Sequence, residues 1–399
     1  MTIQDLALSR AGFLTLREFQ KANGLYPSGQ LDTLTLQALE PFIYGFRRRT
    51  VRSGDTFWAI SQEVGTPLSL LLAANPGLDP KRLSVGQVVT VPLPFPVVPT
   101  SLPFSSQVLE ICITGLTARY PFLTRQTLTR TAFGRPLPVL TVGSGRRSIL
   151  YNASHHANEW ITTPVLMKFL EQLCEAYVLS KEIFGYDARQ LLARCTLHLV
   201  PMVNPDGVDL VTGSISPDEL EYLRARRLAE SYPLIPFPDG WKANLNGVDL
   251  NLNYPAGWDN ARRIKFSQGY TQPGPRDYVG RAPLDQAESA AMAAYTQAVK
   301  PALTFSYHSQ GEVIYWKYLD LAPAGAEAVG RELARVSGYT LDLVPTASGY
   351  AGYKDWFILI YDRPGYTIEV GRGQNPLPLS QFDEIYRKNL GILTLGLVV

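Results

Sequence analysis

The chain has 399 residues, of which 46% are hydrophobic and 18% are charged, so it can bury a substantial core and is not disordered. A net charge of +2 is too weak a bias to indicate nucleic acid or an anionic membrane as a partner. The three cysteines are too few and too widely spaced for a disulfide framework or a Cys-x-x-Cys metal site. No apolar run approaches the ~20 residues that cross a bilayer, and the first residues lack the pattern of a secretory signal peptide.

The first region, residues 1–46, is predicted to form short helices. Phe13, Leu16 and Phe19 recur near helical spacing until Gly24 breaks the pattern. The run LREFQKANGLYPSGQLDTLTLQAL resembles the peptidoglycan-binding helical module. The alternative is a helical hairpin that only packs against its neighbour.

The second region, residues 47–93, is predicted to form a strand, two helices and a second strand. Val51 is expected to open the first strand, Asp55 to cap the first helix, Gly65 to end it, and Asn75 to stop the second helix. The stretch VRSGDTFWAISQEVGTPLSLLLAANPG, with LSVGQVVTVP after it, resembles a LysM domain. LysM modules bind N-acetylglucosamine polymers, so this resemblance implies peptidoglycan or chitin as a partner.

Residues 94–104 lie within the proline-rich run PLPFPVVPTSLPF. Alternating prolines favour an extended polyproline II conformation, which predicts a spacer at a domain boundary.

The third region, residues 105–399, alternates apolar strands with amphipathic helices. Near-continuous apolar runs fit a sheet that is covered on both faces. The expected strands are 139–142, 148–153, 196–203, 302–307, 313–316 and 366–370, and the expected helices are 159–177, 285–299, 324–336 and 379–393. We therefore expect a multidomain chain, in which a small helical module and a βααβ module precede an α/β/α domain with a mixed central sheet.

Two of the four histidines lie where a metal site is expected. His156 and Glu159 follow the strand SILYNAS, and His308 closes the strand ALTFSY. Side chains at the carboxyl ends of strands in an open α/β sheet point into the binding crevice. Zinc accepts imidazole and carboxylate ligands, and a catalytic zinc site leaves a fourth position for water. His155 is expected to orient this loop or to hydrogen-bond a backbone carbonyl, and His198 to be a hydrogen-bonded core residue.

Five motifs occur in the order found in the zinc carboxypeptidase family, M14, which this region resembles. They are HHANEW at 155–160, NPDG at 204–207, GVDLNLNYP at 247–255, YHSQG at 307–311 and TIEVG at 367–371. The resemblance implies one zinc ion held by His156, Glu159 and His308. It also implies that Glu369 is the general base and then the general acid.

A tryptophan followed by a basic residue precedes the GVDLN motif. The family places an arginine there, which stabilises the oxyanion, whereas this chain has Trp241-Lys242. A lysine supplies a point charge in place of a two-pronged fork. Lys242 is therefore the candidate for this role, with an ordinary surface lysine as the alternative.

Two departures from the family concern the substrate. Carboxypeptidases clamp the C-terminal carboxylate with an Asn-Arg pair, but this chain has Asn251-Leu252, and leucine cannot bind a carboxylate. Carboxypeptidases also carry a mobile tyrosine after an Asp-Trp pair, a role that is left open here between Tyr353 and Tyr361. Together with SGYAGYKDWF and RPGYTIEVGRGQNPLP, these departures resemble the γ-D-glutamyl-L-diamino acid endopeptidase branch.

Enzymes of that branch cut the peptidoglycan stem peptide between γ-D-glutamate and diaminopimelate. Diaminopimelate carries a second amino-acid centre, so a carboxylate-binding arginine is expected in the pocket beyond the scissile bond, in addition to Asn251 as a substrate-binding residue. Arg372 is the candidate, and a surface ion pair is the alternative. The resemblance implies a glycan-tethered hydrolase at the bacterial cell wall or in the cytoplasm of a sporulating cell. A metallocarboxypeptidase of altered specificity and a degenerate glycan-binding protein remain as alternatives.

Overall fold

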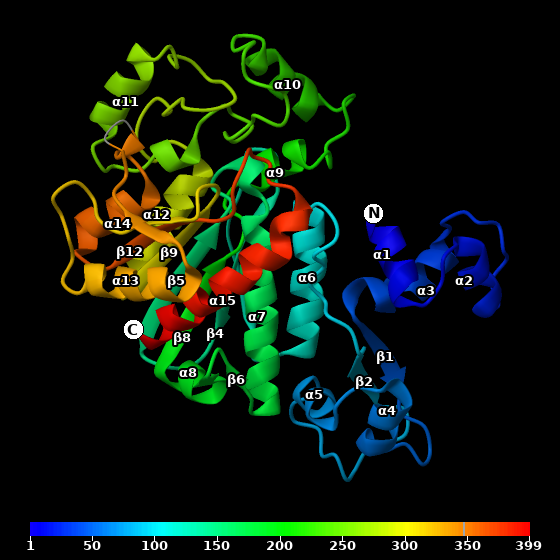
Figure 1. Cartoon of the computed structure of the whole chain (residues 1–399). Coiled ribbons are helices and arrows are strands. Elements are labelled where there is room, and N and C mark those ends of the chain that lie inside the picture. Colours follow the sequence, from blue (N-terminus) through cyan, green and yellow to red (C-terminus); the bar gives the residue numbers. More distant parts are fainter. Residues whose placement is uncertain (346–347) are drawn as a thin grey trace. The chain divides into compact units, whose positions relative to one another are not determined.

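The protein is described by a computed structural model that covers residues 1–345 and 348–399 (Figure 1). It consists of two compact units. The first unit comprises Met1–Leu102, Gln107–Thr124 and Leu170–Glu182. The second unit comprises Pro103–Ser106, Arg125–Phe169 and Ile183–Val399.

Three short helices open the first unit, as the sequence predicts. They are α1 (Ile3–Arg10), α2 (Leu16–Ala22) and α3 (Thr33–Tyr44). The side chains of Thr2, Thr15 and Asp32 each accept a hydrogen bond from a backbone N–H of the first turn, which fixes where the helices begin. Phe19 and Leu39 lie in the apolar core that the helices share.

A βααβ module follows in the same unit. Its elements are β1 (Phe46–Thr50), α4 (Phe57–Val64), α5 (Leu68–Ala73) and β2 (Val88–Pro92), and β1 pairs antiparallel with β2. The predicted order is confirmed, but two local predictions are wrong. The strand ends before Val51, and α4 is capped by Thr56 and not by Asp55. Asp55 instead accepts hydrogen bonds from the Arg52 backbone and the Arg49 guanidinium, which draw its carboxylate away from the helix.

The first stretch of the first unit ends within the proline-rich segment, at Leu102, and residues 94–102 are packed in that unit. Val97 and Val98 are buried, and their N–H groups donate to the Glu171 carboxylate at 2.6 and 3.0 Å. The guanidinium of Arg119 donates to three backbone carbonyls of the same unit. Arg119 ends α6 (Ser106–Arg119), and Glu171 lies on α7 (Thr162–Leu179). Buried charged side chains, which the proline pattern does not reveal, therefore hold this segment.

The second unit is built on a mixed sheet, which in the described residues has eight strands in the order β11-β10-β12-β9-β5-β8-β4-β3. The strands are β3 (Thr124–Arg130), β4 (Pro136–Val142), β5 (Arg147–Ala153), β8 (Cys195–Val200), β9 (Leu303–His308), β10 (Val313–Tyr315), β11 (Thr340–Asp342) and β12 (Gly365–Glu369). β5 is parallel to β8 and β9, whereas β4 and β10 run antiparallel to their neighbours β8 and β12. The mixed sheet and its six predicted strands are confirmed.

The remaining elements surround this sheet. They are η1 (Ala157–Glu159), β6 (Glu182–Ile183), β7 (Tyr186–Asp187), α8 (Ala188–Arg194), α9 (Pro205–Val211), α10 (Leu220–Ala229), η2 (Leu250–Leu252), α11 (Trp258–Ser267), α12 (Ala287–Val299), α13 (Ala326–Ser337), α14 (Tyr353–Tyr361), η4 (Leu379–Gln381) and α15 (Phe382–Val398). Among the residues described, no helix combines the length and the apolar character that crossing a membrane requires.

Helices cover both faces of the sheet, as β5 illustrates. Leu150 packs in a core cluster with Met292 of α12 and Trp356 of α14. The next residue, Tyr151, points to the other face and donates to a carbonyl of α15, which crosses the sheet in Figure 1. Gly396 permits this close approach, because a Cβ there would lie 2.1 Å from the Tyr151 hydroxyl. The predicted α/β/α architecture is confirmed.

Candidate metal centre and active site

Three buried side chains converge at the carboxyl ends of β5 and β9. His156 follows β5, Glu159 lies in η1, and His308 is the last residue of β9. Their candidate ligand atoms all lie within 4.8 Å of one another. The Nδ1 atoms of the two histidines are 3.2 Å apart, and each is 2.9 Å from an oxygen of Glu159. The structure therefore brings together the three residues that the sequence singles out as ligands.

This donor set fits a zinc ion. Two imidazole nitrogens and one carboxylate are ligand types that zinc binds, and three protein ligands leave a further position for water. The other ring nitrogen of His156, Nε2, lies 3.1 Å from Oδ1 of Asp249. A carboxylate behind a ligating histidine fixes the ring orientation and directs the opposite nitrogen to the metal.

Asp249 is a functional residue that the sequence analysis missed. Besides contacting His156, it accepts hydrogen bonds from the backbone N–H groups of Asn251 and Asp277. Burial opposes its ionisation, but the positive charges of His156 and Lys242 hold the pKa of Asp249 below its usual range. Its signal was present in the sequence as the acidic residue of the GVDLN motif.

The NPDG motif joins the ligand loop to the loop that carries Lys242. The side-chain amide of Asn204 donates to the backbone carbonyls of His155, Lys242 and Ala243 at 3.0–3.3 Å. Gly207 lets the two loops approach closely, because a Cβ at this position would lie 2.6 Å from the Ala243 carbonyl oxygen. This motif therefore positions the site without contributing a ligand to it.

Lys242 directs its charge toward the ligand cluster. Its Nζ atom lies 3.3 Å from Oε1 of Glu159, and only 19% of its side chain is exposed. Burial favours the neutral amine, but the charges of Glu159 and Asp249 outweigh it and raise the pKa of Lys242. The ammonium group is therefore positioned to stabilise negative charge that develops beside the cluster.

Glu369 faces the same cluster from the neighbouring strand. It ends β12 and lies opposite His308 in the parallel register of β12 with β9. Burial and the nearby charge of Glu159 raise the pKa of Glu369 to about 8, against the effects of Lys242 and His156. A carboxyl group with such a pKa can both take up and return a proton near pH 7.

These side chains line a cavity of about 410 Å³ that also includes Asn251 and Leu252. The side-chain oxygen of Asn251 accepts a hydrogen bond from the backbone N–H of Tyr353, at the start of α14. Leu252 is 8% exposed and belongs to an apolar cluster with Val279 and Ala351. The position at which carboxypeptidases carry their clamp arginine is thus part of a hydrophobic core.

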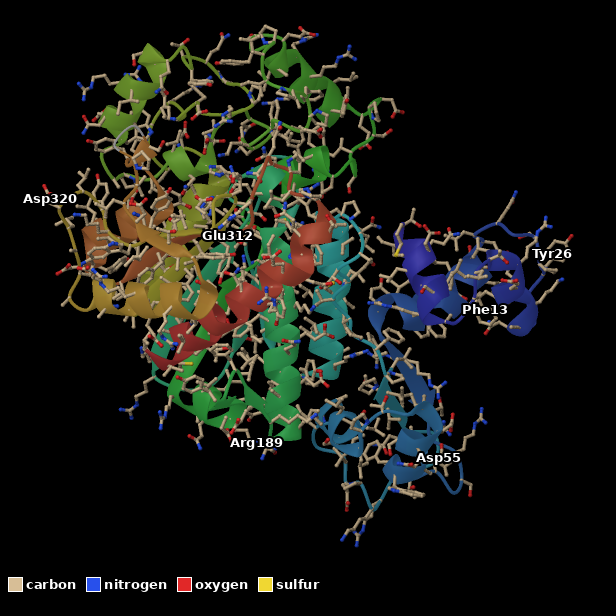
Figure 2. All side chains as sticks on the ribbon, viewed as in Figure 1. Phe13, Tyr26, Asp55, Arg189, Glu312 and Asp320 are labelled. Carbon is tan, nitrogen blue, oxygen red and sulfur yellow. The ribbon has the colours of Figure 1, made fainter. Side chains whose placement is uncertain are left out.

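Arg372 is not where the sequence analysis expected a substrate-binding residue. Its side chain is 76% exposed, and it lies 2.8 Å from the carboxylate of Glu312, which is labelled in Figure 2. It is not among the described residues that line the cavity. The cations that do line the cavity besides Lys242 are Lys265, Arg276 and Lys354. None of the three was predicted as a site residue, although Lys354 lies in the SGYAGYKDWF stretch.

The two tyrosines considered as the mobile residue also lie outside the lining. The Tyr353 hydroxyl is buried and lies 2.8 Å from the Thr296 hydroxyl, and the Tyr361 ring packs against Trp356. Tyr315 on β10 is the tyrosine that the described lining contains.

The other two histidines each contact a tyrosine hydroxyl. Nε2 of His155 lies 3.0 Å from the Tyr254 hydroxyl, and burial lowers the pKa of His155, so that it stays neutral beside the ligands. His198, on β8, lies 2.7 Å from the Tyr295 hydroxyl.

Comparison with known proteins agrees with this geometry. Residues 109–391 match the zinc carboxypeptidase family, and residues 50–92 match the LysM domain. The chain is 42% identical to gamma-D-glutamyl-L-diamino acid endopeptidase 1 of Lysinibacillus sphaericus, over 87% of this chain and 98% of the relative.

Two solved structures share the fold. Carboxypeptidase A of Helicoverpa armigera is similar with a TM-score of 0.57 and 16% identity, covering 84% of this chain and 78% of that one. Bovine thrombin-activatable fibrinolysis inhibitor, in complex with tick carboxypeptidase inhibitor, is similar with a TM-score of 0.55 and 18% identity, covering 74% and 96%. The five ordered motifs and the cluster of candidate metal ligands agree with these matches. The chain belongs to the zinc carboxypeptidase family and carries a LysM domain near its N-terminus.

Proposed function

We propose that this protein is a zinc-dependent peptidoglycan hydrolase that cuts the γ-D-glutamyl–diaminopimelate bond of stem peptides. One observation carries the proposal. The three candidate zinc ligands, Glu369 and Lys242 line the same cavity as Leu252, an apolar residue at the clamp position. The name and 42% identity of the Lysinibacillus sphaericus relative support this substrate.

Five polar residues of the cavity have a role in the proposed reaction. Zinc, when held by His156, Glu159 and His308, supplies Lewis-acid polarisation and lowers the pKa of water. Glu369 takes a proton from the attacking water and later delivers it to the leaving nitrogen. Lys242 stabilises the negative charge that develops on the carbonyl oxygen of the scissile bond.

The lining beyond the clamp position suits a diamino acid. Lys354 is buried, lies 2.6 Å from the carboxylate of Asp355, and donates to the Lys317 carbonyl. The second centre of diaminopimelate carries both an ammonium and a carboxylate. A mixed-charge wall can pair with both groups, whereas the apolar side chain of Leu252 can pair with neither.

The N-terminal modules are proposed to hold the enzyme on its substrate. The LysM domain at residues 50–92 is the expected contact with N-acetylglucosamine glycan, and we assign the same role to the helical module of residues 1–46. A tether of this kind raises the local substrate concentration without changing the chemistry of the site. The protein would then act on the cell wall, or on wall fragments within a sporulating cell.

The proposal is tested by comparing two synthetic substrates with zinc-loaded protein. One is L-Ala-γ-D-Glu-meso-diaminopimelate, and the other is an α-linked tripeptide of ordinary L-amino acids. We expect the first to release diaminopimelate and the second to stay intact, with product identified by mass spectrometry. Rapid release of C-terminal residues from the α-linked peptide, with the first substrate intact, would identify a carboxypeptidase instead.

A further inference from the structure

A second hollow, of about 370 Å³, adjoins the cavity that contains the ligand cluster. Four residues line both spaces: Lys242, Arg276, Gln310 and Asn375. The second hollow includes neither the ligands nor Asn251 and Leu252, so it extends away from the clamp position. If the leaving group occupies the clamp side, the acyl part of the substrate occupies this second hollow.

Arg276 is fixed at the junction of the two spaces. The backbone N–H groups of Lys242 and Ala243 both donate to the carbonyl of Pro275, at 2.8 and 2.9 Å. Arg276 therefore directly follows the residue that anchors the loop of Lys242. Its Nε atom donates to the carboxylate of Asp277 at 2.6 Å, which orients the guanidinium plane.

The outer edge of this guanidinium remains open to a ligand. Within residues 1–345 and 348–399, the structure records a hydrogen bond from Nε of Arg276 and none from its two terminal nitrogens. The side chain is 39% exposed. Asp277 also pairs with Lys265 at 2.6 Å. Burial opposes the ionisation of Arg276 and the charges of Asp277 and Asp249 raise its pKa, but among the described residues neither carboxylate accepts a hydrogen bond from its terminal nitrogens. An oriented, incompletely paired arginine suits bidentate binding of a carboxylate.

The proposed substrate carries such a carboxylate on its acyl side. In a γ-glutamyl bond the side-chain carbonyl is attacked, so the α-carboxylate stays free a short distance away along the glutamyl carbons. If Lys242 lies at the scissile carbonyl, Arg276 is the second cation at the junction of the two spaces, where it can contact this α-carboxylate.

We propose that Arg276 binds the free α-carboxylate of the D-glutamyl residue and makes the enzyme discriminate against peptides in which this group is amidated. This inference rests on the proposed function. It assigns to Arg276 the selection of the acyl group, a role distinct from the chemistry performed by Glu369 and Lys242.

The experiment uses two tripeptides that differ in one group, L-Ala-γ-D-Glu-meso-diaminopimelate and the same peptide with the α-carboxylate converted to carboxamide. We expect wild-type kcat/KM to favour the carboxylate form by about 10–100-fold, the range of a charge-assisted hydrogen-bond pair. Arg276→Gln should remove this preference by slowing the carboxylate form, while the rate on the amide changes less than about threefold. Arg276→Lys should show an intermediate preference, because it keeps the charge but not the fork.

Arg281→Gln is the matched control, since it removes an exposed arginine five positions away and should leave the preference unchanged. Equal losses on both substrates in Arg276→Gln, at an unchanged Tm, would show a purely structural role and overturn the inference. Equal wild-type rates on the two substrates would also overturn it, but would leave the proposed function standing. Cleavage of neither substrate would overturn the proposed function itself.

Discussion

The ligand cluster and the clamp loop, which we define as Asn251 and Leu252, line one cavity. The cluster matches the residue pattern of the family, whereas the clamp loop departs from it. The cluster keeps all three ligand types, and Asp249 fixes one of them from behind. In the clamp loop the position expected to hold a cation is occupied by Leu252, which is packed in an apolar cluster. The comparison teaches that the hydrolytic chemistry is kept while the means of selecting the substrate has changed.

The two regions also differ in how they are built. His308 and Glu369 lie at the ends of neighbouring sheet strands, where the backbone pairing fixes their separation. The clamp loop is a short 3-10 turn between loops, and such connections accept substitutions more readily than strands of a central sheet. Changes that act on one region and spare the other therefore test the comparison.

Glu369→Gln should have the largest effect, because it removes the proton carrier and leaves the ligands in place. We expect kcat to fall by about 10²–10⁴-fold, with zinc content unchanged by metal analysis. The Tm should not fall, because the variant replaces a carboxyl whose ionisation is opposed by burial. Glu230→Gln, at an exposed position, is the control, and near-wild-type activity in Glu369→Gln would rule out this base.

Lys242→Met should lower kcat by about 10²–10³-fold, because it removes the cation that faces the developing oxyanion. KM should change little, and Lys242→Arg should recover part of the lost rate, since arginine retains the charge. Steady-state kinetics on the γ-linked tripeptide measures both values, with the exposed Lys181→Met as control. An unchanged kcat would mean that the ammonium group plays no part in the reaction.

Asp249→Asn should weaken zinc binding by about 10–100-fold, because it removes the charge behind His156 while keeping a hydrogen-bond acceptor. Competition with a chelator measures this affinity. Asp320→Asn, at an exposed side chain labelled in Figure 2, should leave it unchanged. Equal affinity in both variants would contradict the orienting role of Asp249.

Leu252→Arg tests the clamp loop alone and should have the smallest effect on chemistry. An arginine in the apolar cluster should lower the free energy of unfolding by about 1–3 kcal/mol. It should not create efficient carboxypeptidase activity, because the side chain at this position is only 8% exposed at the cavity and packs with Val279 and Ala351. Denaturant unfolding measures the stability loss, and efficient release of C-terminal residues by the variant would show that position 252 alone determines the substrate.

The sequence predicts the cluster well because each ligand stands at the end of an apolar strand or in an ordered motif. Arg276 carried no such signal. Its place beside Lys242 depends on hydrogen bonds from that loop to the Pro275 carbonyl, which join segments more than thirty positions apart. Residues that meet only through irregular loops are not predictable from local patterns.

Arg372 is the opposite case, because its closeness to Glu369 in sequence suggested closeness in space. It follows Glu369 by three positions, but the chain turns at Gly371, whose φ is +67°. That left-handed conformation turns the chain away from the direction of β12, and Arg372 lies beside Glu312 instead.

Two strands of the eight-stranded sheet were also missed, both at its edges. Most residues of β3 are exposed and polar, and β11 has three residues, so neither gives the apolar run that marks a buried strand.

The measurement that tests the central claim most directly is mass spectrometry of disaccharide-tripeptide and disaccharide-tetrapeptide fragments digested by the zinc-loaded protein. We predict a disaccharide that retains L-Ala-D-Glu, together with free diaminopimelate from the first fragment and diaminopimelyl-D-alanine from the second. Removal of the terminal D-alanine alone, or intact fragments under conditions in which zinc is bound stoichiometrically, would contradict the account.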